Sequence, residues 1–311
     1  MKAWQFEGTG KPIALNEVPD PEPGPGEVVL DMRAAGLCHS DVMYMQVGER
    51  AMPFLPMTQG HENAGVISAL GEGVTGWQVG DVVGVCPSGV RPPAGMFTPG
   101  GFAEKMVAHS ADLARVPEGL DIALGALATD AGMTSYHAII KEGGARAGMK
   151  VGVIGYGGLG QVGTRAAVLQ GAEVHVAETK ESVWDLARAA GAVDVVADAA
   201  AWARQDFDLV VDYAGYDTTQ AAVDSVRRGG TVVQVGLGLP TFTIQANSIL
   251  GKTIKGSLGG TVEDIEEVYD LFLRKEIEPA YEVITFDEIG EGLARLARHE
   301  VTGRLVARFG D

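Results

Sequence analysis

Two short stretches near the start of the chain carry side chains that can bind a metal ion or act as nucleophiles. Residues 36–41 read Gly-Leu-Cys-His-Ser-Asp and residues 60–65 read Gly-His-Glu-Asn-Ala-Gly. Neither stretch is decisive alone, because a lone buried cysteine is usually inert and an isolated histidine usually satisfies a local hydrogen bond. A reactive pair of Cys38 and His39 is disfavoured, since neighbours in an extended segment point to opposite faces.

A glycine-rich stretch at 155–160, Gly-Tyr-Gly-Gly-Leu-Gly, lies between a strand predicted at 150–154 and a helix predicted from about residue 161. In such a turn the first glycine permits the tight bend, the second lets a pyrophosphate approach the backbone, and the third lets helix and strand pack closely. The helix N-terminus adds unpaired N–H groups and a positive dipole end. The stretch therefore predicts a dinucleotide-binding loop formed by Gly155, Gly157, Gly158, Leu159 and Gly160.

An acidic residue follows the next predicted strand, 173–177, where a dinucleotide fold places the residue that binds the adenosine ribose. Glu178 can accept hydrogen bonds from both ribose hydroxyls there and would repel a 2′-phosphate. Lys180 carries the opposite charge and partly compensates. NAD(H) is therefore favoured over NADP(H), and the second cofactor stays open.

Hydrophobic patterning divides the chain into differently built parts. Up to about residue 130, short apolar runs broken by Gly and Pro predict a mainly β domain. Beyond 131, alternating strands and helices predict an α/β fold with a doubly wound parallel sheet. The predicted strands there are 150–154, 173–177, 194–196, 207–212 and 231–235, and the predicted helices are 161–170, 182–190 and 219–227. Two amphipathic helices, 262–274 and 286–298, and a strand at 304–309 close the chain.

Composition narrows the function classes. A length of 311 residues suits two domains, and 46% hydrophobic with 21% charged residues is typical of a soluble globular protein. A net charge of −17 argues against nucleic acid and anionic membranes as partners. The sequence has no apolar run long enough to span a bilayer and no signal peptide. Two cysteines cannot build a disulfide framework, which favours the cytoplasm.

Taken together, these stretches resemble the medium-chain dehydrogenase/reductase family, and within it the zinc-dependent alcohol dehydrogenases. The resemblance covers nearly the whole chain and includes Gly-Pro-Gly-Glu-Val at 24–28, Gly-Asp-Val-Val at 80–83, Lys-Gly-Ser at 255–257 and Thr-Gly-Arg-Leu-Val at 302–306. It implies a β-rich GroES-like catalytic domain at 1–130, a Rossmann dinucleotide-binding domain at 131–258, and a return to the catalytic domain at 259–311. It also implies hydride transfer between NAD(H) and a small alcohol or its aldehyde or ketone.

The resemblance implies one catalytic zinc ion. Cys38 and His61 match the first two ligands, and Asp130 falls at the position of the third. Glu62 is a candidate exchanging fourth ligand, and Asp41 resembles the carboxylate that orients the ligating imidazole. Three protein ligands of these types would leave one position open for the substrate oxygen.

Further roles follow from the resemblance alone. Ser40 matches the hydroxyl that relays the alcohol proton, but Met43 stands where many relatives carry a histidine that ends the relay. Water or His39 is therefore expected to take the proton onward. Residues that match positions contacting the cofactor pyrophosphate are His39 and Arg304, and those that match nicotinamide contacts are Thr134, Val235 and Leu237.

The segment 86–101 departs from the family pattern. Many relatives hold a structural zinc ion there with four cysteines, whereas this segment has one, Cys86, and a single thiol makes no closed tetrahedral site. No structural zinc is expected. Family resemblance implies a homodimer or homotetramer. Two alternatives stay open: a zinc-free quinone or enoyl reductase of the same family, and a non-catalytic nucleotide-binding scaffold.

Overall fold

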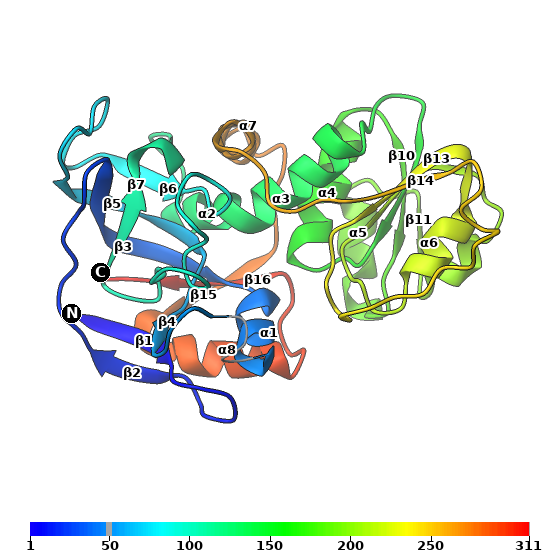
Figure 1. The fold of residues 1–311 in the computed structure, drawn as a ribbon. Helices are drawn as coiled ribbons and strands as arrows, with labels where there is room; N and C mark the ends of the chain where they lie inside the picture. Colours follow the sequence, from blue (N-terminus) through cyan, green and yellow to red (C-terminus); the bar gives the residue numbers. More distant parts are fainter. Residues whose placement is uncertain (48–51, 311) are drawn as a thin grey trace. The chain divides into compact units, whose positions relative to one another are not determined.

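A computed structural model describes residues 1–47 and 52–310 and divides them into two compact units (Figure 1). The first unit comprises Met1–Met133, Thr261–Lys275 and the described residues from Tyr281 on. The second comprises Thr134–Gly260 and Glu276–Ala280.

The second unit is built on a six-stranded sheet in which every pair of neighbours is parallel. Its strands lie in the order β11-β10-β9-β12-β13-β14, which is 3-2-1-4-5-6 when counted from the first strand of the unit. This is the order of a doubly wound dinucleotide-binding sheet. The strands are β9 (Lys150–Ile154), β10 (Glu173–Ala177), β11 (Asp194–Val196), β12 (Phe207–Asp212), β13 (Val226–Gln234) and β14 (Thr253–Gly256).

Helices connect these strands and lie beside them in Figure 1. They are α4 (Gly158–Leu169), α5 (Trp184–Ala189) and α6 (Thr219–Ser225), with the short turns η5 (Glu181–Val183) and η6 (Ala199–Trp202). The segment before β9 holds α3 (Met133–Tyr136) and the π-helix η4 (His137–Glu142). The sequence-based prediction of an α/β fold with a parallel sheet is therefore confirmed.

The first unit is β-rich and is organised by one long strand, β3 (Glu27–Leu37). β3 pairs antiparallel with β5, β7 and β16, and its pairing with β5 contains two register shifts. The main sheet has the order β15-β16-β3-β5-β6-β8, with β7 also on β3, and a second sheet has the order β2-β1-β4. These strands are β1 (Lys2–Phe6), β2 (Ala14–Glu17), β4 (Met57–Thr58), β5 (Glu62–Leu70), β6 (Val82–Val85), β7 (Lys105–His109), β8 (Leu113–Arg115), β15 (Tyr281–Thr285) and β16 (Arg304–Arg308).

The helical segments of the first unit are α1 (His39–Val47), η2 (Ser110–Asp112), α2 (Ile122–Leu127), the π-helix η3 (Ala128–Gly132), α7 (Val262–Leu273), η7 (Phe286–Glu288) and α8 (Ile289–Ala297). The patterning predicts α7 and α8, whereas α1, α2 and η3 lie in the part predicted as mainly β.

Each unit has its own apolar core. In the first unit Leu30, Leu37 and Leu305 are fully buried, and α8 adds Leu293. In the second, Trp202 and Phe207 are fully buried against strand and helix residues. Among the residues that the structure describes, no helix has the length and apolar character needed to cross a bilayer.

Candidate metal centre and dinucleotide site

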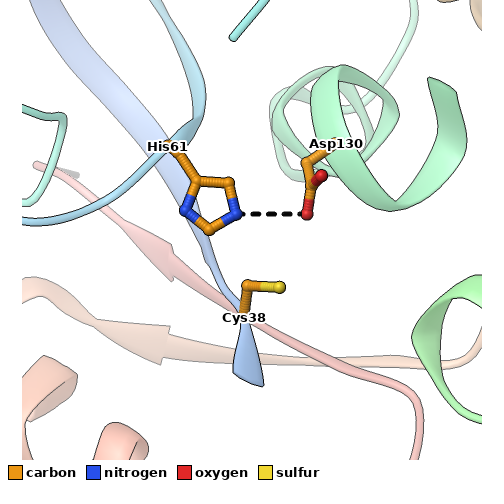
Figure 2. Close-up of side chains that lie close together, drawn as sticks. All are labelled: Cys38, His61 and Asp130. Atoms are coloured by element: carbon orange, nitrogen blue, oxygen red, sulfur yellow. Dashed lines mark ion pairs between the residues drawn. The ribbon is translucent and has the colours of Figure 1, made fainter. Parts of the chain in front are cut away.

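Three side chains from distant parts of the chain converge in the first unit. One ligand atom from each of Cys38, His61 and Asp130 lies within 4.8 Å of the others. Figure 2 shows the three side chains pointing toward one another, with His61 Nε2 3.3 Å from Asp130 Oδ2. Cys38 and His61 are buried and Asp130 is half-buried. A sulfur, a nitrogen and an oxygen at this spacing form a donor set suited to zinc.

Asp41 holds two of these residues in place. Its Oδ2 accepts a 2.9 Å hydrogen bond from the Cys38 backbone N–H, and its Oδ1 lies 3.0 Å from His61 Nδ1. The carboxylate is itself 2% exposed. Because Asp41 engages Nδ1, the other ring nitrogen of His61 is left facing the cluster, as a ligating imidazole requires.

A widened helical turn presents Asp130. This residue lies in the π-helix η3, which follows α2 directly. Thr129, its buried neighbour, accepts a 3.0 Å hydrogen bond from the Asn63 backbone N–H and donates a 2.8 Å bond to the Ala126 carbonyl. Thr129 thereby ties the turn to β5 two residues after His61. Sequence reasoning did not identify Thr129, and a threonine inside a helical segment gives no signal of this contact.

Arg304 is a buried member of the cluster. Its Nη2 lies 2.6 Å from Asp130 Oδ2 and 2.5 Å from Glu62 Oε2, and its Nε lies 2.7 Å from the same Glu62 oxygen. The sequence alone classes Arg304 as an ordinary surface charge, and this was wrong, because the residue is 4% exposed. Its contact with the cofactor pyrophosphate stays a prediction.

Glu62 is fully buried beside the three candidate ligands. Its Oε1 has no hydrogen-bond partner. Gly36, opposite Glu62 in the β3–β5 pairing, makes room for the carboxylate, since a Cβ there would lie 2.2 Å from Glu62 Cδ. A buried carboxylate oxygen without a donor, next to this set of ligand types, is the arrangement expected where a cation binds.

Burial and neighbouring charges shift the acid–base behaviour of this cluster. Burial lowers the pKa of His61, but the carboxylates of Asp41 and Asp130 outweigh it and hold the pKa well above its ordinary value. Burial raises the pKa of Glu62 to about 7, against the opposing charge of Arg304. Three carboxyl groups therefore share a site with His61 and Arg304, and a bound divalent cation would take the place of the protons that His61 and Glu62 hold in the metal-free protein.

Ser40 and His39 begin helix α1 beside the cluster. The Ser40 hydroxyl lies 3.6 Å from Cys38 Sγ, and its backbone N–H donates to the same sulfur at 3.5 Å. The His39 ring is exposed and stacks on the ring of His299. Cys38 and His39 thus do not form a thiol–imidazole pair. Met43 is half-buried one helical turn from Ser40.

The glycine loop of the second unit has the form that the sequence predicts. Gly155 has φ +85°, a left-handed conformation that glycine adopts without strain. A Cβ at Gly160 would lie 1.8 Å from the Gly155 carbonyl oxygen, so only glycine fits there. A Cβ at Gly157 would meet nothing within 4 Å, which leaves open space at the N-terminus of α4. The space and the adjacent N–H groups, including those of Gly158 and Leu159, suit a diphosphate.

Glu178 is held against this loop. Its Oε2 accepts the Tyr156 backbone N–H at 2.7 Å, and its Oε1 accepts the Lys180 backbone N–H at 2.7 Å. The carboxylate is half-buried at the end of β10. The backbone of the loop thus fixes the acid that the sequence assigns to the ribose.

The remaining predicted cofactor residues follow the carboxyl end of β13 or precede β9. Val235 follows β13, with its N–H 2.9 Å from the Asp212 carbonyl oxygen, and Leu237 is 61% exposed. Thr134 is buried in α3.

Asp212 is a residue that sequence reasoning missed. Its fully buried carboxylate accepts the N–H groups of residues 214 and 215 and the Thr218 hydroxyl, and so organises the loop after β12.

Comparison with known proteins covers both units of the chain. Residues 24–118 match the alcohol dehydrogenase GroES-like domain and residues 158–274 match the zinc-binding dehydrogenase domain. An alcohol dehydrogenase of Geobacillus stearothermophilus is 32% identical, with 99% of both chains covered. The chain belongs to the medium-chain dehydrogenase/reductase family, in its alcohol dehydrogenase group. The resemblance stated from the sequence is therefore confirmed.

Two further relatives differ in the cofactor that their names give. An acetophenone reductase of Geotrichum candidum, solved in complex with NAD, has a TM-score of 0.89 and 32% identity, covering 100% of this chain and 97% of that one. An NADP-dependent alcohol dehydrogenase of Mycolicibacterium smegmatis is 27% identical, covering 98% of this chain and 97% of that one. Family membership alone therefore leaves the choice of cofactor to the residues of this chain.

Proposed function

We propose that this protein is a zinc-dependent alcohol dehydrogenase that transfers hydride between NAD(H) and a small alcohol or the corresponding aldehyde or ketone. One observation carries the proposal: Cys38, His61 and Asp130 converge with ligand atoms within 4.8 Å of one another in a protein of this family. These three residues would hold the ion, with Glu62 as an exchanging fourth ligand. No structural zinc ion is proposed, because segment 86–101 offers a single thiol.

The bound ion supplies Lewis-acid stabilisation of negative charge on the substrate oxygen. The chain's own residues do the rest. Asp41 keeps the His61 ring in one orientation, and Arg304 balances the charge of the Glu62 and Asp130 carboxylates. Ser40 is the hydroxyl nearest the cluster along α1 and would accept the alcohol proton in oxidation. Because Met43 has no proton-accepting group, the proton would leave through water or through His39.

The second unit would hold the nicotinamide cofactor. The glycine loop would bind the diphosphate, and Thr134, Val235 and Leu237 would contact the nicotinamide. Glu178 favours NAD(H), because its carboxylate is tied to the loop backbone through Tyr156 and would lie close to a 2′-phosphate. Lys180 stays close enough in sequence to moderate this preference.

Elemental analysis of protein purified without added metal, together with NADH and NADPH titrations followed by fluorescence, tests the proposal. About one zinc ion per chain, tighter binding of NADH, and turnover of an alcohol or ketone panel are expected. The Cys38→Ser variant should lose zinc and turnover, whereas Cys86→Ala, a change at the other buried thiol, should keep both.

The two alternatives predict different results. Active protein without zinc would place the chain among zinc-free reductases. Tight cofactor binding without turnover of any alcohol, aldehyde or ketone would indicate a nucleotide-binding scaffold.

We further propose a homodimer or homotetramer formed through the second unit, in a reducing cytoplasm. β14 is an edge strand, and the segment before it exposes apolar side chains: Leu239, Phe242, Ile249 and Leu250. Exposed apolar side chains next to a sheet edge favour self-association. Light scattering should show that Leu250→Glu lowers the oligomeric state, whereas Val193→Glu, next to the opposite edge strand β11, does not. Cys38 and Cys86 are thiols that form no disulfide, which agrees with a reducing compartment.

A further inference from the structure

A tryptophan of helix α5 is hydrogen-bonded to the acidic residue that follows β10. The Trp184 indole N–H donates a 2.7 Å hydrogen bond to the Glu178 backbone carbonyl. The Glu178 backbone N–H donates in turn to the Val196 carbonyl at 2.8 Å. Because Trp184 is half-buried, its bond is partly shielded from water and is stronger than an exposed one. The backbone of Glu178 is therefore held on both sides.

The same helix is bonded to the glycine loop. Tyr156, the second residue of this loop, is 4% exposed, and its hydroxyl donates a 3.1 Å hydrogen bond to the Leu186 carbonyl of α5. Its backbone N–H donates to Glu178 Oε2 at 2.7 Å. The loop, the end of β10 and α5 are thus joined in a ring of three hydrogen bonds, two of which end on Glu178.

This ring leaves the Glu178 carboxylate little freedom to turn. Its second oxygen, Oε1, accepts the Lys180 backbone N–H at 2.7 Å and the Thr179 hydroxyl at 3.3 Å. A carboxylate bonded in this way still has lone pairs for ribose hydroxyls. It cannot swing aside for a 2′-phosphate without losing its bonds to the backbone. A repulsive group that stays in place is an effective way to reject the wrong ligand.

We propose that Trp184 and Tyr156 are positioning residues for cofactor specificity, which keep the Glu178 carboxylate where it rejects a 2′-phosphorylated cofactor. The inference rests on the proposed function and names residues that set its preference for NAD(H). Both residues act through Glu178 and need no contact with the cofactor. A carboxylate released from them can turn away, and the positive charge of Lys180, two residues on, then favours the phosphate.

The test compares Trp184→Phe with Trp202→Phe. Trp202 is a fully buried tryptophan of the same unit whose indole N–H has no hydrogen-bond partner, so its replacement removes the same ring atoms but no bond. Calorimetric titration uses ADP-ribose and 2′-phospho-ADP-ribose, which differ only in the 2′-phosphate, and ADP-ribose should bind the parent protein more tightly. Trp184→Phe should lower the ratio of the two affinities by roughly three- to tenfold. Trp202→Phe should lower the unfolding temperature and leave this ratio unchanged.

Two further variants show whether the effect passes through Glu178. Tyr156→Phe removes only the hydroxyl bond to α5 and should lower the ratio in the same direction. When Glu178 is already alanine, Trp184→Phe should not change the ratio further, because the two residues act as a unit. An unchanged ratio in either single variant would overturn the role given to that residue, and an equal loss of affinity for both ligands would overturn the inference. A parent protein that binds neither ligand would refute the proposed function, and the inference would fail with it.

Discussion

Single carboxylates decide how the metal centre is held. Asp41 is the clearest case, because one side chain fixes the backbone of one candidate ligand and the ring of another. An amide at this position keeps the shape of the side chain but supplies only one acceptor oxygen for the two contacts.

Asp41→Asn should therefore lower zinc affinity by about 10- to 100-fold, measured by competition with a chromogenic chelator. The matched control is Asp112→Asn. Asp112 is an equally buried carboxylate of the same unit that accepts the N–H groups of Val90 and Arg91. Its replacement should cost stability without a comparable loss of zinc affinity, and equal losses from both variants would contradict the role given to Asp41.

The raised pKa of Glu62 makes the stability of the metal-free protein depend on pH. Its pKa rises from 4.5 to about 7 because the carboxyl group is buried. A group that binds its proton more tightly when folded stabilises the fold below its unfolded pKa and loses this contribution as pH rises through the folded pKa. The unfolding free energy of the metal-free protein should therefore fall between pH 4.5 and 7, by about 1–3 kcal/mol from this group.

Denaturant unfolding at a series of pH values checks this. Glu62→Gln should flatten the decrease, whereas the exposed Glu118→Gln should leave it unchanged. The raised pKa of His61 gives a loss of the same sign at higher pH, and this part should survive in Glu62→Gln. A metal-free protein that gains stability over this range would refute the account.

Glycines in strands and helices leave space that lets a neighbouring element pack closely. Gly36 in β3 leaves the space that the Glu62 carboxylate fills. Gly36→Ala should cost about 1–3 kcal/mol of unfolding free energy and weaken zinc binding, since the added methyl group displaces Glu62. Gly256→Ala is the control, because a Cβ at this strand glycine would meet no atom closer than 4.0 Å. Thermal unfolding and metal analysis of both variants would separate a local clash from a general effect of strand glycines.

A glycine in the first turn of α4 gives a similar prediction for cofactor binding. Gly160→Ala places a methyl group against the Gly155 carbonyl and should weaken NADH binding by about tenfold or more while zinc content stays constant. Gly125→Ala, in helix α2, is the control because its Cβ would have ordinary contacts from 3.4 Å outward. Equal NADH affinities of the two variants would show that the glycine loop binds the cofactor even when its backbone is distorted.

Local signals explain which elements the sequence predicts. The glycine loop and the alternating strands and helices of the second unit depend on residues close together in the chain, and the structure agrees with them. Arg304 shows the limit, since Glu62 lies 242 residues away and the pairings of β16 with β3 and of β3 with β5 bring the two residues together.

Helices α1 and α2 and the π-helix η3 were missed for a related reason. Their sequences lack a regular apolar stripe: Asp41 and Val42 are the buried residues of α1, and α2 is six residues long. Asp130 was placed by family resemblance, and no sequence rule predicts the π-helical turn that presents it.

At the scale of the whole molecule, each unit carries its own candidate binding site, since the three metal-ligand residues lie in the first unit and the glycine loop lies in the second. Removing the metal should therefore loosen the first unit far more than the second. Hydrogen exchange followed by mass spectrometry should show lost protection in β3, β5 and η3 after chelation, while β9 and β12 keep theirs. Adding NADH to the chelated protein should protect the second unit without restoring the first. Uniform loss of protection over both units would contradict this division.

The interleaved path of the chain has a consequence for synthesis on the ribosome. β16 pairs with β3 and carries Arg304, yet it is made about 270 residues after β3. At roughly 5–20 residues per second, residues 34–37 of β3 wait many seconds for their partner strand, and Glu62 waits as long for the Arg304 guanidinium. The second unit lies almost entirely within one stretch and can fold during that interval. Nascent chains should therefore bind dinucleotide before they can retain zinc, and chaperones that cover strand edges should act on the first unit.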